Sequence, residues 1–312
     1  MHTVLGSNGQ IGTEVARELR QRFDREVRLV SRRPRPVSAR DELVPADLLD
    51  PAQTHRAVEG SEVVYLTAGL PMDTQLWVEQ WPVLMRNVIA ACAAHGAKLV
   101  FFDNTYMYPQ TAEPQSEATE FRPHGPKGEV RGAIARELLD AIASGRVEGL
   151  IGRAPEFYGP AQTQSVTTSM VIDPLWAGKT AKVLVSADTR RSLIYTPDAS
   201  RALALLGNTP DAFGRTWHLP VDPERPTYRQ LVERAAATFG VVPKLRVLRP
   251  WQLRLAGLVS RKAQGAAELL PRYGVDNLFV ADSFTRRFPD FRVTTIDEGL
   301  GAIRDERRAA DP

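Results

Sequence analysis

The chain has 312 residues, 43% of them hydrophobic and 25% charged, and its 40 basic residues exceed its 37 acidic ones by three. This composition is ordinary for a soluble globular protein, and the length allows one large domain or two. Basic and acidic residues are interleaved, and the longest apolar run, residues 88–94, is too short to cross a bilayer, so we expect no nucleic-acid and no membrane partner.

A single cysteine, Cys92, excludes an internal disulfide framework and fits a reducing compartment. The first predicted strand begins at Thr3, which leaves no room for a signal peptide, so we expect a cytoplasmic protein. The five histidines are scattered without the spacing of zinc ligands, and we therefore expect no metal site.

At the start of the chain, a short apolar strand runs straight into a glycine-rich turn and an amphipathic helix. Glycines spaced three apart let the backbone bend sharply, approach a ligand's phosphates and pack closely against the helix, whose first N–H groups face an anion. The pattern predicts a dinucleotide-binding site, and the alternative is a plain strand–helix turn. The predicted cofactor-binding residues here are Gly6, Ser7, Asn8, Gly9, Gln10, Ile11 and Gly12.

Strands and helices then alternate as far as residue 153. We predict strands at residues 26–31, 43–44, 63–67, 98–102 and 149–153, and helices that begin at Pro51, Asp73 and Pro126. The helix that begins at Asp73 contains Pro82, which should kink or split it. The alternation predicts an α/β fold, a doubly wound parallel Rossmann sheet with its ligand at the carboxyl ends of the strands.

The rhythm changes after Pro160. Residues 161–168 are predicted to form a loop, and short elements follow: helices near residues 171–178, 196–207, 227–239, 251–260 and 262–270, and strands near 182–186, 192–195, 216–219 and 243–248. We therefore predict a dinucleotide-binding domain over residues 1–160, with returning segments at about 190–220. Residues 161–189 and 221–312 would form a smaller, irregular α+β part that binds the substrate.

The end of the second strand bears on the choice of cofactor. A site that prefers NAD(H) usually has Asp or Glu there, about 20 residues past the glycines, where the carboxylate binds the ribose 2′-hydroxyl. This chain has Ser31-Arg32-Arg33 instead. A carboxylate would repel a 2′-phosphate and guanidinium groups would bind it, so the sequence favours NADP(H), with NAD(H) possible. The alternative is a solvated surface run of arginines, which Arg35 continues.

The glycine spacing, G-x-x-G-x-x-G, resembles that of the short-chain dehydrogenase/reductase superfamily, in its extended branch of sugar-nucleotide epimerases, dehydratases and related reductases. The resemblance implies that Asp47 and Leu48 contact the adenine, although Asp47 could instead cap a helix, because Asp50 is close by. It also implies that Ala154 and Phe157 lie near the nicotinamide. Small residues at the end of the fourth strand suit close approach to the cofactor: Thr67, Ala68 and Gly69.

In that branch the fifth strand ends in Ser-Ser/Thr-x-x-Val-Tyr-Gly, and the second hydroxyl residue polarises the substrate. Here the strand runs into Asp103-Asn104-Thr105-Tyr106-Met107-Tyr108-Pro109. Tyr108 matches the motif's tyrosine, Asn104 falls at the catalytic Ser/Thr position, and Thr105 supplies a hydroxyl one residue later. The resemblance implies that Asn104 and Thr105 polarise the substrate.

The branch also has a Tyr-x-x-x-Lys motif, which this chain lacks. Its best match is Lys127-Gly128-Glu129-Val130-Arg131, with Lys in place of Tyr and Arg in place of Lys. Both cations would lie on one helix face, so Arg131 could orient the ribose. Lys127 could act as acid and base if burial or Arg131 favoured loss of its proton near neutrality. The alternative is that both cations anchor the cofactor's phosphate or ribose, or are solvated.

Two later stretches extend the resemblance over nearly the whole chain. Residues 152–160 and 217–220, Gly-Arg-Ala-Pro-Glu-Phe-Tyr-Gly-Pro and Trp-His-Leu-Pro, look like a subgroup of bacterial proteins labelled NAD-dependent epimerase/dehydratase. Residues 190–198 resemble the Arg-Asp-Tyr-Ile-x-x-x-Asp stretch that lies near the substrate, with Ser192 in place of the Asp. The residues expected to contact substrate are Tyr106, Tyr158 and Arg191.

These observations favour an NADP(H)-dependent oxidoreductase that moves a hydride to or from a small organic substrate with a carbonyl, an imine or an activated C=C bond. One alternative is an epimerase or dehydratase that retains its NAD(P), and another is a sensor or scaffold that binds the dinucleotide without chemistry. The helices at residues 73–95 and 126–144 match those that pair in the superfamily's dimers, so the resemblance implies a homodimer.

Overall fold

The structure is a computed structural model that describes residues 1–161, 165–252 and 268–310. Its backbone divides into two compact units, each made of three separate segments. Unit 1 consists of Met1–Met107, Pro126–Ala154 and Ala199–Leu219, and unit 2 of Tyr108–Gly125, Pro155–Asp198 and Pro220–Pro312. These boundaries differ from the expected ones, because residues 108–125 and 155–160 group with unit 2 and the chain returns to unit 1 only at Ala199.

Unit 1 is built around a seven-stranded sheet in the order β10-β6-β5-β4-β1-β2-β3, in which every neighbouring pair is parallel. Its strands are β1 His2–Leu5, β2 Val27–Ser31, β3 Glu42–Pro45, β4 Val63–Leu66, β5 Lys98–Asp103, β6 Gly149–Arg153 and β10 Thr216–His218. This is the predicted doubly wound sheet. The strand order reverses between β1 and β4, and ligands of such sheets bind at the carboxyl ends beside this reversal.

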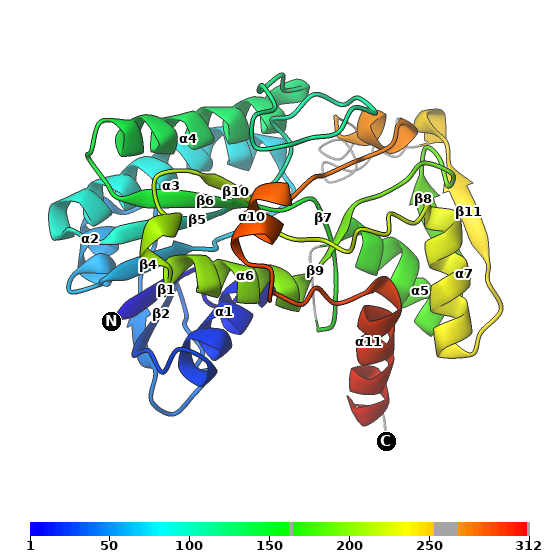
Figure 1. The fold of residues 1–312 in the computed structure, drawn as a ribbon, viewed down its shortest axis with the longest axis horizontal. Coiled ribbons are helices and arrows are strands. Elements are labelled where there is room, and N and C mark those ends of the chain that lie inside the picture. The colour runs from blue at the N-terminus through cyan, green and yellow to red at the C-terminus, as the bar shows by residue number, and fades with distance from the viewer. Residues whose placement is uncertain (162–164, 253–267, 311–312) are drawn as a thin grey trace. The chain divides into compact units, whose positions relative to one another are not determined.

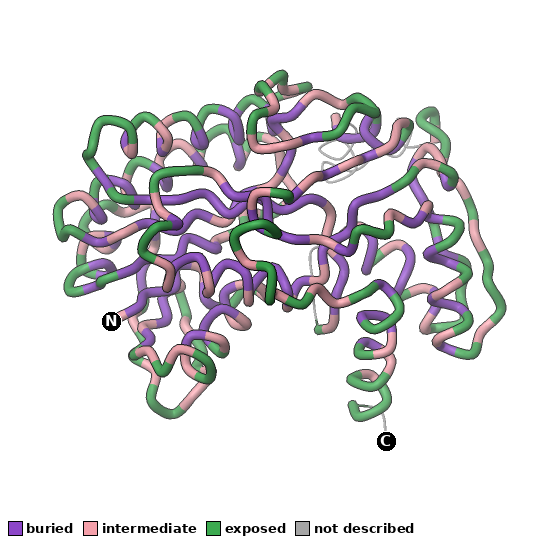
Figure 2. Tube along the Cα trace, in the orientation of Figure 1, coloured by how far each residue is buried: buried purple, intermediate pink, exposed green. Residues whose placement is uncertain are grey.

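Helices cover both faces of the sheet: α1 Gln10–Gln21, α2 Pro51–Val58, α3 Thr74–His95, α4 Gly125–Ala143 and α6 Thr196–Gly207. Figure 1 shows α2, α3 and α4 on one face and α1 and α6 on the other. With both faces covered, β1, β4 and β6 are buried along their whole length, as the purple tube of Figure 2 shows. Uninterrupted apolar strands are therefore the expected pattern here.

Pro82 does not split its helix. The helix α3 runs without interruption from Thr74 to His95 and ends at Gly96, whose φ of 65° is left-handed. Neighbouring side chains such as Trp81 and Met85 are buried, and this packing outweighs the local cost of the proline. Although α3 is long, no helix in the described part of the chain is both long and apolar enough to span a membrane.

Unit 2 has two small sheets and short helices around its own core. The strand β7 Glu156–Tyr158 pairs with β9 Leu193–Tyr195, and β8 Ala181–Leu184 pairs with β11 Leu245–Leu248, both in parallel. The helical elements are a π-helix at Thr168–Ile172, α5 Asp173–Trp176, α7 Tyr228–Phe239, a 3₁₀ turn at Leu270–Gly274, α10 Asp282–Arg287 and α11 Ile296–Ala310. Its core includes Leu175, Leu231 and Leu300. Unit 2 is the smaller, irregular α+β part that the sequence predicts.

Several local expectations in unit 2 need correction. Helical structure begins at Val166, within the stretch predicted as loop to Thr168, because the π-helix extends the element toward its N-terminus. The helices predicted at 251–260 and 262–270 fall largely outside the described residues. The strand β8 ends in a three-residue turn that the sequence did not indicate. There Ser186 N–H donates to the Leu184 carbonyl at 2.7 Å, and Val185 has a φ of 63°.

Candidate functional site

The glycine loop, residues 6–12, lies directly against the end of β4. Gly6 has a φ of 87°, and a Cβ added to it would lie 2.4 Å from the Ala68 Cα. A Cβ on Gly12 would lie 2.8 Å from both the Gly6 carbonyl oxygen and the Thr67 Oγ1. Only glycine fits at either position. The structure therefore brings the predicted residues Thr67 and Ala68 against this loop.

The first turn of α1 contains no acidic residue, and its N-cap, Gly9, offers no side chain. The loop before it is held by the β2 backbone, because Gly6 N–H and Ser7 N–H both donate to the Val30 carbonyl, at 2.9 and 3.1 Å. The first N–H groups of a helix carry partial positive charge, so this end of α1 can bind an anion such as a pyrophosphate.

The segment that follows β2, residues 32–41, is called the arginine loop here. Arg32, Arg33 and Arg35 are exposed, and among the described residues their guanidinium groups have no acidic partner. The loop touches the glycine loop through Asn8. Its side-chain amide Nδ2 donates to the Arg33 carbonyl at 2.7 Å, and its Oδ1 accepts the Arg35 N–H at 3.1 Å.

No carboxylate of this loop is available to bind a ribose. Asp41 is its one acidic residue, and the Asp41 side chain is fully enclosed. Its Oδ2 accepts the N–H groups of Val37 and Ser38 at 2.9 and 2.6 Å, and its Oδ1 accepts Arg20 Nε at 3.0 Å. At the end of β2, the Ser31 hydroxyl accepts the Arg33 N–H at 3.2 Å.

The predicted adenine side is a turn between β3 and α2. Asp50 is the N-cap of α2 and accepts the Gln53 N–H at 3.0 Å, so Asp47 is not the helix cap. Asp47 Oδ1 instead accepts the Leu49 N–H at 3.0 Å. Leu48 is buried, and its carbonyl accepts the Asn87 amide at 2.9 Å. Their contact with adenine stays a prediction.

Asp103 organises a buried cluster at the carboxyl ends of β5 and β6 that the sequence analysis missed. Asp103 Oδ1 accepts Arg131 Nε at 3.0 Å, and Oδ2 accepts Arg153 Nε at 3.1 Å. The Arg131 guanidinium also lies 4.5 Å from the Trp81 ring centre and 5.0 Å from that of Phe101. A charged residue that ends an otherwise apolar strand is a signal for such a pair, because buried charges need partners.

The cluster corrects the expectation for Arg131. Its side chain is only 4% exposed and is turned to Asp103, so it does not stand as a free cation toward a ribose. Asn104 lies beside the cluster and is half-buried. Its N–H donates to Asp103 Oδ1 at 2.8 Å, and its own Oδ1 accepts the Tyr106 N–H at 3.0 Å. Thr105, the other residue expected to polarise the substrate, is 3% exposed.

Lys127 lies on α4 with no exposed surface. Its Nζ donates to Thr74 Oγ1 and lies 5.9 Å from the centre of the Trp77 ring. Thr74 is the first residue of α3 and is partly exposed. Tyr106, also partly exposed, stacks on Trp77 with 5.8 Å between ring centres. The Lys127 side chain therefore reaches the start of α3, where it binds the hydroxyl of a partly exposed residue.

Two residues expected to contact substrate are enclosed in unit 2 instead. Arg191 has no exposed surface, forms an ion pair with Glu156, and donates through Nη1 to the Arg272 and Val275 carbonyls at 2.8 and 3.0 Å. Burial alone would raise the pKa of Glu156, but Arg191 and Arg272 outweigh it and hold the pKa below its usual range. Tyr158 is 1% exposed, and a Cβ on Gly299 would lie 2.5 Å from its hydroxyl. Both side chains are buried among residues of unit 2, and their contact with substrate stays a prediction.

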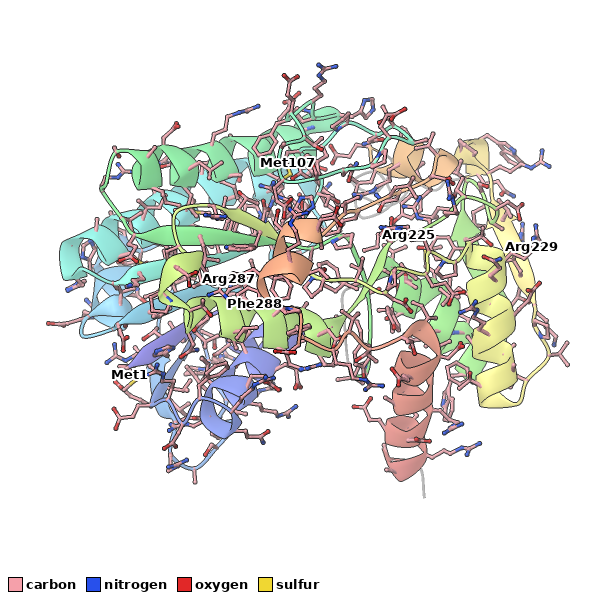
Figure 3. All side chains as sticks on the ribbon, viewed as in Figure 1. Met1, Met107, Arg225, Arg229, Arg287 and Phe288 are labelled. Atoms are coloured by element: carbon pink, nitrogen blue, oxygen red, sulfur yellow. The ribbon has the colours of Figure 1, made fainter. Side chains whose placement is uncertain are left out.

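Ser192 stands where the resembled motif has Asp, and its hydroxyl is already hydrogen-bonded within the protein. Its hydroxyl donates to the Asn277 carbonyl at 2.9 Å and accepts Arg225 Nε at 3.2 Å. Arg225 is one of the side chains labelled in Figure 3.

Of the two predicted nicotinamide-side residues, Ala154 belongs to unit 1, where its N–H donates to the Asp103 carbonyl at 3.0 Å, and Phe157 belongs to unit 2. No group of three potential metal-binding side chains occurs among the residues that the structure describes.

Comparison by sequence gives one match. The model of the family described as NAD dependent epimerase/dehydratase matches residues 2–219. No curated protein matches the chain by sequence.

Comparison by structure gives several likenesses along the whole chain. The UDP-glucose 4-epimerase of Thermus thermophilus, in complex with NAD, is 19% identical with a TM-score of 0.79, over 99% of this chain and 100% of that one. The UDP-glucuronic acid 4-epimerase of Bacillus cereus, in complex with UDP-glucuronic acid and NAD, is 16% identical with a TM-score of 0.80, over 99% of both chains. A dTDP-glucose 4,6-dehydratase of Streptomyces venezuelae with NAD bound is 17% identical with a TM-score of 0.79, over 99% of this chain and 97% of that one. At these identities the likeness shows the fold.

Proposed function

The chain belongs to the NAD-dependent epimerase/dehydratase family, and from this premise we propose that it is an enzyme that moves a hydride between a nicotinamide dinucleotide and an organic substrate. The proposed reaction is an epimerisation or a dehydration, in which the substrate is oxidised and then reduced again without net consumption of the cofactor. The family match favours an epimerase or dehydratase over the reductase that the residues of the sequence favour. The observation that carries the proposal is the glycine loop against β4.

The residues of unit 1 fit a dinucleotide. Side chains at Gly6 and Gly12 would collide with Ala68, with Thr67 and with the loop's own backbone, so the glycines let the loop pack closely against the end of β4. The N–H groups at the start of α1 would hold the pyrophosphate, since no acid opposes it there. When bound, the nicotinamide would supply the hydride acceptor and donor.

Proton transfer would use Lys127 and Thr74. In this proposal a proton held at Lys127 Nζ passes through Thr74 Oγ1, the hydroxyl to which Nζ donates; Lys127 is buried and Thr74 is partly exposed. Asn104 and Thr105 follow β5 and would polarise the reacting oxygen of the substrate. Asp103 fixes the Asn104 backbone through its N–H, and so acts as a positioning residue.

For the cofactor we propose NADP(H), although the three solved structures carry NAD. The support comes from the arginine loop, where three exposed guanidinium groups lack an acidic partner among the described residues. The one carboxylate of the loop, Asp41, is enclosed and already bonded. Such a loop attracts a 2′-phosphate and offers nothing to a ribose 2′-hydroxyl that would favour NAD(H).

A second candidate is the NADP(H)-dependent reductase of a carbonyl, imine or activated C=C bond. It is favoured by Lys127 and Arg131, which stand where epimerases and dehydratases of the extended branch would have Tyr and Lys. Because the chain lacks the Tyr-x-x-x-Lys motif, a protein that binds the dinucleotide without catalysis is a third candidate. Net consumption of NADPH separates the reductase from the epimerase or dehydratase.

The test begins with the purified protein, titrated with NADPH and NADH while tryptophan fluorescence and energy transfer to the nicotinamide are followed. The protein with NADP⁺ or NAD⁺ is then incubated with UDP-glucose, UDP-glucuronic acid or dTDP-glucose, and nicotinamide absorbance and sugar products are measured. We expect a changed sugar without lasting change in absorbance. Lys127→Met should lower turnover by about a hundredfold or more with dinucleotide binding retained, whereas the exposed control Lys182→Met should not.

Each other outcome has a distinct meaning. Net NADPH consumption in a screen of carbonyl and imine substrates would replace the epimerase by the reductase. Binding without turnover of any substrate would favour the sensor. Failure to bind either dinucleotide would remove the proposal altogether.

A further inference from the structure

The arginine loop is fixed to the rest of unit 1 at two points. Near its start, Asn8 bridges it to the glycine loop, with Nδ2 bound to the Arg33 carbonyl at 2.7 Å and Oδ1 bound to the Arg35 N–H at 3.1 Å. Near its end, Asp41 gathers the N–H groups of Val37 and Ser38 and is itself held by Arg20 of α1 at 3.0 Å. Both anchors act on the loop's backbone.

The two anchors differ in what they connect. Asp41 ties the loop to the flank of α1, and its side chain is fully enclosed. Asn8 is exposed and lies within the glycine loop itself, two residues after Gly6. One amide side chain therefore couples the segment predicted to hold the pyrophosphate with the segment that carries Arg32, Arg33 and Arg35.

We infer that Asn8 is a positioning residue that sets cofactor selectivity: it holds the backbone of the arginine loop so that these guanidinium groups are arranged for a 2′-phosphate before the cofactor binds. The inference rests on the proposed NADP(H) function and deepens it. Asn8 acts through the loop, since its amide is already bonded to the Arg33 and Arg35 main chain.

A physical argument separates this role from simple support of the glycine loop. Long arginine side chains lose freedom when they bind, and a loop held in its bound form loses less. Releasing the loop should therefore weaken binding of ligands that carry the 2′-phosphate. Ligands without it depend on the glycine loop, which Val30 holds independently through the N–H groups of Gly6 and Ser7. The ratio of the two affinities therefore separates a released arginine loop from a damaged glycine loop.

The experiment measures dissociation constants of the full-length protein for NADPH, NADH, 2′,5′-ADP and 5′-AMP by calorimetry, in wild type and in Asn8→Ala. We expect Asn8→Ala to raise the dissociation constants for NADPH and 2′,5′-ADP by about tenfold. The dissociation constants for NADH and 5′-AMP should rise by less than about twofold. Arg33→Ala should shift the ratio in the same direction. Gln21→Ala, an exposed change at the end of α1, is the matched control and should leave all four constants unchanged.

The outcomes distinguish the inference from the function on which it rests. One outcome is that the wild-type protein prefers NADPH and that Asn8→Ala lowers the affinities for NADPH and NADH equally. The inference about Asn8 is then overturned, and the proposed cofactor stands. If wild type prefers NADH, the NADP(H) proposal fails and the inference with it. Melting temperatures without ligand accompany each variant, and an Asn8→Ala protein as stable as wild type with a reduced selectivity ratio supports the inference.

Discussion

Val185 is a β-branched residue in a backbone conformation that suits glycine. Its φ of 63° lies in the left-handed region, and the Ser186 N–H bond to the Leu184 carbonyl closes a tight turn around it. A Cβ in this region costs about 1–2 kcal/mol, and this form of the turn is rare and strained. The half-buried side chain packs on the core of unit 2, which repays part of that cost.

The strain predicts that glycine stabilises the protein more than alanine does at position 185. Val185→Ala and Val185→Gly both lose the packed side chain, but only glycine relieves the backbone. Val185→Gly should therefore be more stable than Val185→Ala by about 1 kcal/mol in urea unfolding. At Lys182, an exposed position in β8, the ordinary order should hold and alanine should be the more stable. If the alanine variant were more stable than the glycine variant at both positions, the backbone at Val185 would not be strained.

At the scale of elements, Asp103 joins β5, α4 and β6 through its two arginines. Asp103→Asn keeps the shape but leaves the two buried cations without their shared carboxylate, so we expect a loss of about 3–5 kcal/mol in the free energy of unfolding. The double variant with Arg131→Met should be less destabilised than Asp103→Asn alone, because it also removes a charge. Asp188→Asn, in the exposed pair with Arg229, should cost far less, because solvent screens that pair. Equal losses for Asp103→Asn and Asp188→Asn would contradict this role.

The elements of unit 1 could be predicted because their signals are local. Apolar strands bounded by glycine or proline, and the glycine loop, depend on residues a few positions apart. The partners of Asp103 lie 28 and 50 residues away, at Arg131 and Arg153, and the sequence alone does not pair them. For the same reason Arg131 was expected to face a ribose. In unit 2, the enclosure of Tyr158 and Arg191 depends on Gly299 and on the Arg272 carbonyl, also distant in sequence.

At the scale of the whole molecule, buried His2 makes stability depend on pH. Burial, and then Arg25, lower its pKa from 6.5 to about 4. Between these values the unfolded chain binds a proton that the folded protein does not, so the free energy of unfolding falls as pH drops from above 6.5 toward 4. We expect a loss of about 2 kcal/mol between about pH 7.5 and about pH 5 from this group.

The control is His2→Gln, which can still hydrogen-bond the Tyr65 hydroxyl that lies 3.2 Å from His2 Nδ1. Urea unfolding at both pH values should show a smaller decrease for His2→Gln than for wild type. An identical pH dependence in the two proteins would exclude His2 as the cause.

The homodimer expected from α3 and α4 stays a prediction that light scattering of the purified protein can test.

The interleaving of the two units has a consequence for biosynthesis. A ribosome makes the glycine loop long before β10, the edge strand of the same sheet, which ends at His218. Between them the nascent chain has twice left unit 1 for unit 2 and come back, at residues 126 and 199. Neither unit can therefore be expressed by cutting the gene once, and a chain stopped before residue 216 would leave β6 as an exposed edge, where unpaired backbone groups invite association between chains.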